Sequence, residues 1–126
     1  MIGLQNNPPA SDEDILALEE RLRVSFPPDY KRLLRCANGF SLDSGVLMFS
    51  TDEIEERNST WEVALYAPGY FAIGGTGGGD AILIQQNQSP SRLFIVGVGS
   101  MTPNMMRELA PNLEQWLEGG IEIPED

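Results

Sequence analysis

The sequence predicts a single α+β domain with a pair of helices near its N-terminus, a central and mainly antiparallel sheet of short strands, and a C-terminal helix. Apolar residues recur at helical spacing near both ends of the chain, and short apolar runs separated by turn residues fill the middle. The links between these runs are too short for parallel crossovers. The 126 residues suit one core, so we predict one domain over residues 1–126. Its core spans about residues 11–118, between a short N-terminal tail and an acidic C-terminal tail.

Two helices are predicted first. Ser11 is suited to cap the first helix, because serine accepts hydrogen bonds from free N–H groups and the acidic residues after it favour the positive end of the helix dipole. Prolines 27 and 28 end this helix, and Pro28 fits the first turn of the next. The second helix should end at Asn38-Gly39. Its apolar positions follow the i, i+3, i+4, i+7 pattern, and we expect all four to be buried: Tyr30, Leu33, Leu34 and Ala37.

The middle of the chain predicts strands with one exposed helix among them. Residues 46–49 favour a strand, residues 51–58 one or two turns of exposed helix, and residues 61–66 either a strand or an ordered loop. Residues 70–73, 81–84 and 93–96 are three clearer strands. The last helix centres on Leu113, Trp116 and Leu117, begins at Pro111 or Asn112, and ends at the glycine pair 119–120.

The charge of the chain excludes some partners and favours others. Nineteen acidic against eight basic residues give a net charge of −11 and a field that repels nucleic acid and anionic membranes. Such a field attracts basic partners, although acidity also serves solubility alone. Histidine is absent, which removes the usual general base and the commonest metal ligand. With no signal-like N-terminus and no apolar run of about 18 residues, the sequence predicts a cytoplasmic protein.

The chain contains a single cysteine, so it can form no disulfide within itself. Cys36 adjoins the apolar face of the second helix, and we expect it to be buried or half-buried as a small hydrophobic residue. A nucleophilic role would need a neighbouring base or positive field. The sequence indicates no catalytic, metal-binding or cofactor-binding residues.

The order of these signals resembles the SUKH superfamily, the Smi–Knr cell-wall-assembly-regulator-like domain. The resemblance rests on an acidic-apolar helix, then Phe26-Pro27-Pro28-Asp29-Tyr30, then a helix ending in Asn38-Gly39, with phenylalanine where the family usually has leucine. An Ile73-Gly74 step before the glycine-rich turn and the closing hydrophobic helix extend the resemblance over roughly residues 11–118.

The resemblance implies an α+β fold and a function in protein binding. Many bacterial members are immunity proteins that neutralise toxins, often nucleases, by direct contact, and others are regulatory or scaffolding modules. We therefore expect a non-enzymatic antitoxin with a basic, nuclease-like protein partner, no cofactor, no nucleic-acid ligand and no membrane contact. A regulatory module without a toxin partner is the alternative, and a small hydrolase using carboxylates is a remote one.

Two segments are candidates for the binding site. Residues 74–79 form a glycine-rich loop without the lysine or the helix start of a phosphate loop, so we predict a turn between two strands. Asp80 follows the loop and could either hold its N–H groups or contact a partner. The acidic cluster 52–56 is either a solvated face or a binding face. The predicted partner-binding residues are Asp52, Glu53, Glu56 and Asp80.

Aromatic residues gather on both sides of Pro68-Gly69. Core packing is the first expectation for them, but any that is left exposed would be suited to anchor an interface. The four are Trp61, Tyr66, Tyr70 and Phe71.

Overall fold

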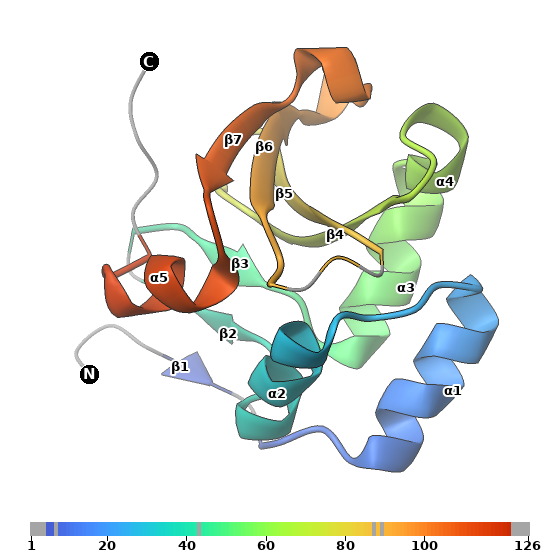
Figure 1. Ribbon diagram of the computed structural model, residues 1–126, viewed down its shortest axis with the longest axis vertical. Helices are drawn as coiled ribbons and strands as arrows, with labels where there is room; N and C mark the ends of the chain where they lie inside the picture. The colour runs from blue at the N-terminus through green and yellow to red at the C-terminus, as the bar shows by residue number, and fades with distance from the viewer. Residues whose placement is uncertain (1–4, 7, 43, 87, 89, 122–126) are drawn as a thin grey trace.

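A computed structural model describes residues 5–6, 8–42, 44–86, 88 and 90–121 of the protein. Within them the strands form a seven-stranded sheet in which every neighbouring pair is antiparallel and the strand order follows the chain order, β1 to β7. Helices α1 and α3 lie side by side on one flank of the sheet, and α5 lies on the other (Figure 1). The predicted α+β class, helix pair, antiparallel sheet and C-terminal helix are confirmed.

The helices begin where the sequence predicts them. The α1 helix spans Asp12–Leu22, and the Ser11 side chain accepts a 3.0 Å hydrogen bond from the Asp14 N–H. The α2 helix spans Pro28–Cys36, and α5 spans Leu113–Glu118 with Asn112 as its N-cap. Leu34 is 2% exposed in the core, whereas Leu33 is only half-buried, which corrects the expectation that all four apolar positions of α2 are buried.

The segment between α2 and β4 is more helical than predicted. The α3 helix runs over Thr51–Thr60, and a second short helix, α4, covers Val63–Tyr66 where we expected a strand or loop. Glu62 separates the two helices with φ of 52°, a left-handed conformation that few residues other than glycine adopt. Val63 and Ala67 are both 0% exposed, so burial of this i, i+4 pair holds α4 against the sheet.

Four strands form the larger part of the sheet: β4 (Tyr70–Gly75), β5 (Asp80–Gln85), β6 (Leu93–Gly97) and β7 (Arg107–Ala110). The first three match the predicted strands, and β7 was not predicted. The shorter strands are β1 (Gln5–Asn6), β2 (Phe40–Ser41) and β3 (Leu47–Met48). Two 3₁₀ turns, Val98–Ser100 and Pro103–Met105, connect β6 to β7.

Residues 5–6 and 8–10, which the sequence predicts to belong to a short N-terminal tail, make backbone contacts with the rest of the fold. β1 pairs with β2, the Ala10 N–H donates to the Leu34 carbonyl at 2.9 Å, and the Asn38 N–H donates to the Pro8 carbonyl at 3.1 Å. The acidic C-terminal tail that the sequence predicts over residues 122–126 lies outside the described residues.

An aromatic cluster joins the helices to the sheet. The rings of Phe26 and Phe71 stack with centroids 4.8 Å apart, and Tyr30 meets Phe26 edge-on at 5.3 Å. All three side chains are at most 2% exposed. Aromatic pairs in this geometry add to the free energy gained by burying their large surfaces, so Phe26 and Tyr30 anchor the Phe-Pro-Pro-Asp-Tyr segment to the core.

Candidate protein-binding surface

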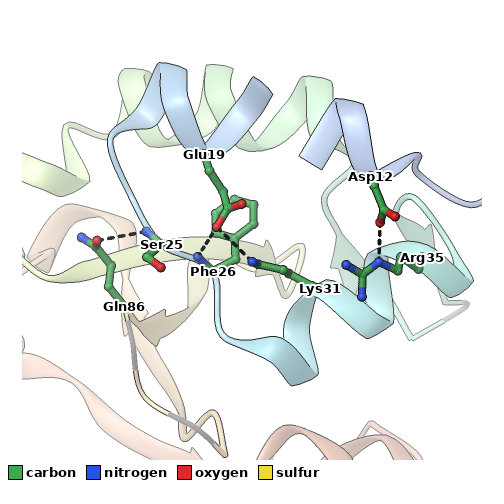
Figure 2. Close-up of polar contacts among 7 residues, drawn as sticks. All are labelled: Asp12, Glu19, Ser25, Phe26, Lys31, Arg35 and Gln86. Carbon is green, nitrogen blue, oxygen red and sulfur yellow. Dashed lines mark hydrogen bonds and ion pairs between the residues drawn. The ribbon is translucent and has the colours of Figure 1, made fainter. Parts of the chain in front are cut away.

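The turn between α1 and α2 is held by a half-buried carboxylate. The Glu19 Oε2 atom accepts a 2.8 Å hydrogen bond from the Phe26 N–H and lies 3.6 Å from the Lys31 Nζ, as Figure 2 shows. On the same turn, the Ser25 N–H donates to the Gln86 side chain at 3.3 Å. Phe26 lies in the link between the two helices, and the Glu19 carboxylate supplies the acceptor for its N–H.

Asp29, the acid of the resemblance motif, ties α2 to the segment before β6. Its two carboxylate oxygens accept hydrogen bonds from the Ser91 N–H at 2.7 Å and from the Ser91 hydroxyl at 2.5 Å. One of them also accepts from the Tyr30 N–H at 2.9 Å. Ser91 is 0% exposed, so Asp29 satisfies two buried donors that have lost contact with water. The motif carboxylate is structural, because both of its oxygens are engaged within the fold.

The Asn-Gly step after α2 positions α3. The Asn38 Oδ1 accepts from the Thr51 N–H at 2.7 Å, and its Nδ2 donates to the Thr51 hydroxyl at 3.2 Å. Gly39 has φ of +88°, and a Cβ atom there would lie 2.7 Å from the Ser50 nitrogen. Asn58 anchors the other end of α3, since its amide exchanges hydrogen bonds with the Ala72 N–H and carbonyl at 2.8 and 2.9 Å.

The glycine-rich loop is a turn between β4 and β5, as predicted. The Thr76 N–H donates to the Asp80 carbonyl at 3.1 Å and closes it. Gly77 has φ of +82°, and its Cβ would lie 2.9 Å from the Gly45 carbonyl oxygen, so a larger residue there would be strained. Gly78 has no positive φ. A β-hairpin presents no helix N-terminus to a phosphate group.

The four predicted partner-binding residues occupy two places. Asp52, Glu53 and Glu56 lie on α3, whereas Asp80 opens β5 opposite Gly97 of β6. Glu53 completes a capping box, because its Oε1 accepts a 2.9 Å hydrogen bond from the Ser50 N–H.

The remaining acids of the cluster differ in their contacts. Glu56 accepts from the Thr60 hydroxyl at 2.7 Å and lies 3.5 Å from the Arg57 Nε. The exposed Asp52 makes no ion pair with another described residue. Of the four acids on α3, Asp52 is the one whose side chain makes no hydrogen bond or ion pair with another described residue.

The negative charge is concentrated on one side of the protein. Residues 11–23 and 51–66, which we call the acidic layer, contain α1, α3 and α4 and carry ten acidic and three basic side chains, a net charge of −7. The other described residues carry five of each sign. The Arg21 Nε and Glu55 Oε1 atoms lie 3.0 Å apart and link α1 to α3 within this layer.

The aromatic residues around Pro68-Gly69 divide into packed and exposed ones. Phe71 is buried, Tyr70 meets the Phe94 ring at 5.4 Å, and Trp61 packs beside Phe49 at 5.8 Å. Tyr66 is 50% exposed, and the neighbouring Leu65, which the sequence analysis did not select, is 65% exposed. Because both lie on α4, the acidic layer also carries an exposed apolar pair.

Two open grooves lie on opposite regions of the surface. One of about 280 Å³, the α3–α4 groove, lies among α1, α3, α4 and the start of β4. The other, the α2–α5 groove of about 300 Å³, is lined by Leu33, Cys36, Leu113 and Leu117 with polar residues at its edge. Cys36 is exposed at that groove, which corrects the expectation that it is buried or half-buried. By helical spacing Cys36 lies on the far side of Leu33 from the face that buries Tyr30 and Leu34, so its side chain is outside the core.

In the described part of the chain, the Cys, Asp and Glu side chains form no group of three that could hold a metal ion. Asp29 and Glu114 are carboxyls lining the α2–α5 groove, but the Asp29 oxygens already accept three hydrogen bonds. No helix in the described ranges combines the length and apolar content needed to cross a membrane.

The fold defines a small α+β domain in which helices pack on an antiparallel meander. Hydrogen bonds of the polar motif residues hold neighbouring elements together. The chain belongs to the SMI1 / KNR4 family (SUKH-1), whose family model matches residues 9–119. It is also similar to the uncharacterized protein YnaB of Bacillus subtilis (strain 168), with 39% identity over 66 residues. That match covers 52% of this chain and 44% of YnaB, so the chain spans less than half the length of this relative.

Proposed function

We propose that this domain acts by binding a basic, nuclease-like toxin and neutralising it by direct contact, as an immunity protein does, without catalysis and without a cofactor. The observation that carries the proposal is the uneven distribution of acidic and basic side chains between the acidic layer and the rest of the described residues. The acidic layer has a net charge of −7, while the rest of the described surface is balanced. A nuclease presents positive charge to phosphate groups, so an acidic inhibitor can compete with nucleic acid for the same groove.

Family membership supports the kind of partner, and the charge supports its sign. The polar residues of the family-like motif, Asp29 and Asn38, are engaged in holding the fold. Partner recognition then depends on the outer faces of the helices. We propose that the toxin is bound in the cytoplasm, where a nuclease toxin reaches its nucleic acid.

The test is affinity capture from native lysate, followed by association kinetics with the purified partner. Asp52 and Glu20 are exposed acids in the first turn of α3 and the last turn of α1, so we expect the pair Glu20→Lys and Asp52→Lys to lower the association rate about tenfold or more at low salt. The matched control reverses Glu114 and Glu118 on α5, which makes the same change in net charge outside the acidic layer.

The control pair should change the rate by less than about twofold, and rising salt should slow the wild-type protein most. An acidic or neutral partner would contradict the electrostatic mechanism, and so would a rate that is indifferent to salt. A basic partner without nuclease activity would support a regulatory module in place of an immunity protein. Glu53 is a poor choice for reversal, since its capping box links it to the stability of α3.

A further inference from the structure

The α3–α4 groove lies within the acidic layer, and five of the nine residues that line it are apolar. It holds about 280 Å³ and is lined by both half-buried and buried hydrophobic side chains. Phe71, at its base, is 2% exposed and belongs to the central aromatic cluster, so this part of the groove is rigid. The apolar lining consists of Leu22, Val24, Ala64, Tyr70 and Phe71.

The polar groups of the groove are largely engaged already. The Asn58 amide donates to the Ile54 and Ala72 carbonyls at 2.8 and 2.9 Å and accepts from the Ala72 N–H at 2.8 Å. Arg21 and Glu55 pair with each other at 3.0 Å. A polar metabolite would have to displace these contacts, whereas an apolar side chain gains free energy simply by leaving water. The groove is therefore suited to a hydrophobic anchor.

Two exposed apolar residues follow the groove-lining Ala64 on α4. Ala64 lines the groove, and Leu65 and Tyr66 follow it on α4 with 65% and 50% of their surfaces exposed. They face outward because Val63 and Ala67, both 0% exposed, fix the inner side of α4. Hot spots of protein interfaces combine such aromatic and aliphatic residues with a pocket.

We propose that the α3–α4 groove, together with Leu65 and Tyr66, is the anchoring site for a basic segment of the partner that inserts an apolar side chain between α1 and α4. The inference rests on the proposed function and names the face and the chemistry of its contact. The surrounding layer, with its net charge of −7, selects a segment with lysine or arginine beside the inserted residue. The α2–α5 groove is of similar size, but it lies in the region whose charges balance.

The first experiment needs no knowledge of the partner. Three capped peptides of equal length serve as probes: leucines flanked by lysines, leucines flanked by glutamates, and glycines flanked by lysines. Titration into ¹⁵N-labelled protein should move backbone NMR signals of residues lining the α3–α4 groove for the lysine–leucine peptide and much less for the other two. Signals that move only at the α2–α5 groove would overturn the inference, and so would no movement at millimolar peptide.

Filling each groove supplies the matched control. Ala64 and Cys36 are exposed residues lining the two grooves, so we expect Ala64→Trp to weaken peptide binding about tenfold and Cys36→Trp to leave it unchanged. Leu65→Ala, at a 65% exposed position, should weaken it without affecting folding. Thermal unfolding of each variant verifies that the fold is intact. Equal loss for both tryptophan variants would contradict a site-specific anchor.

The purified partner separates this inference from the proposed function. If a basic partner binds wild-type protein and Ala64→Trp equally well, the groove is not the anchor, and the proposed function stands. If the lysine–leucine peptide binds in the groove but the captured partner is acidic, the proposed function fails. The inference that the groove binds a basic segment with an apolar side chain then still holds. A second copy of this chain would reveal itself as concentration-dependent dimerisation that Ala64→Trp abolishes, which would also overturn the proposed occupant.

Discussion

The joint around α2 and the acidic layer use polar side chains in opposite ways. At the joint, Asp29 and Asn38 accept hydrogen bonds from backbone N–H groups that no helix or strand satisfies. In the layer, acids such as Glu20 and Asp52 are exposed and make no ion pair with other described residues. The difference teaches that the motif which identifies the family maintains the fold, while the residues suited to meet a partner lie outside it.

The largest expected difference in stability is between replacing a core leucine of the joint and replacing an exposed leucine of the acidic layer. Leu34 is 2% exposed and Leu65 is 65% exposed. Leu34→Ala should lower the free energy of unfolding by about 2–5 kcal/mol, because it removes buried methyl groups and leaves a cavity. Leu65→Ala should change it by less than about 0.5 kcal/mol. Urea unfolding measures both, and similar values would remove the distinction between the two regions.

Two carboxylates test the same comparison, because one is hydrogen-bonded within the joint and the other is exposed on the acidic layer. Asp29→Ala would leave the N–H and hydroxyl of the buried Ser91 without their acceptor, so we expect a loss of about 3 kcal/mol. Glu20→Ala removes the same kind of charge from the surface of α1 and should cost less than about 0.5 kcal/mol. The midpoints of chemical unfolding give the comparison. If Asp29→Ala lowered the free energy of unfolding by as little as Glu20→Ala does, the hydrogen bonds of Asp29 would not stabilise the fold.

The smallest expected effect is a change in folding stability at alkaline pH that depends on a buried tyrosine. Burial raises the pKa of the Tyr30 hydroxyl, whereas Tyr66 is 50% exposed. Above about pH 10 the unfolded chain releases the Tyr30 proton and the folded one retains it, so stability falls as pH rises. Tyr30→Phe should change stability by less than about 1 kcal/mol at neutral pH and should reduce the alkaline loss. Unfolding curves of wild-type protein and Tyr30→Phe at neutral pH and above about pH 10 test this, and an equal alkaline loss in both would contradict it.

The sequence predicts the elements whose pattern is local. The apolar runs at 70–73, 81–84 and 93–96 are strands, and the capped, amphipathic patterns before Leu22 and Cys36 are helices. β7 was missed because Arg107 and Glu108 face solvent, so its sequence lacks an apolar run. The α4 helix was missed because its four residues favour a strand as readily as a helix, and burial of Val63 against the sheet decides between them.

The candidate site was less accessible to sequence reasoning than the fold. The acidity of 52–56 was visible, but the roles of Glu53 in a cap and of Glu55 in an ion pair with Arg21 depend on geometry. The α3–α4 groove joins Leu22, Ala64 and Phe71 from three separate segments, and no short pattern marks such a surface. Asp29 was visible as a motif residue, but its partner Ser91 lies 62 positions away. The predicted partner-binding role of Asp80 stays a prediction.

The strand order of the sheet has a consequence for how the chain folds. Because each strand pairs with the next one along the chain, β4 to β7 can form by successive closure of short connections, each of which costs little chain entropy. The pairing of β3 with β4 spans α3 and α4, and the pairing of β1 with β2 spans α1 and α2, so both close larger loops. We therefore expect amide protection to develop first in the four C-terminal strands and last at the N-terminal edge.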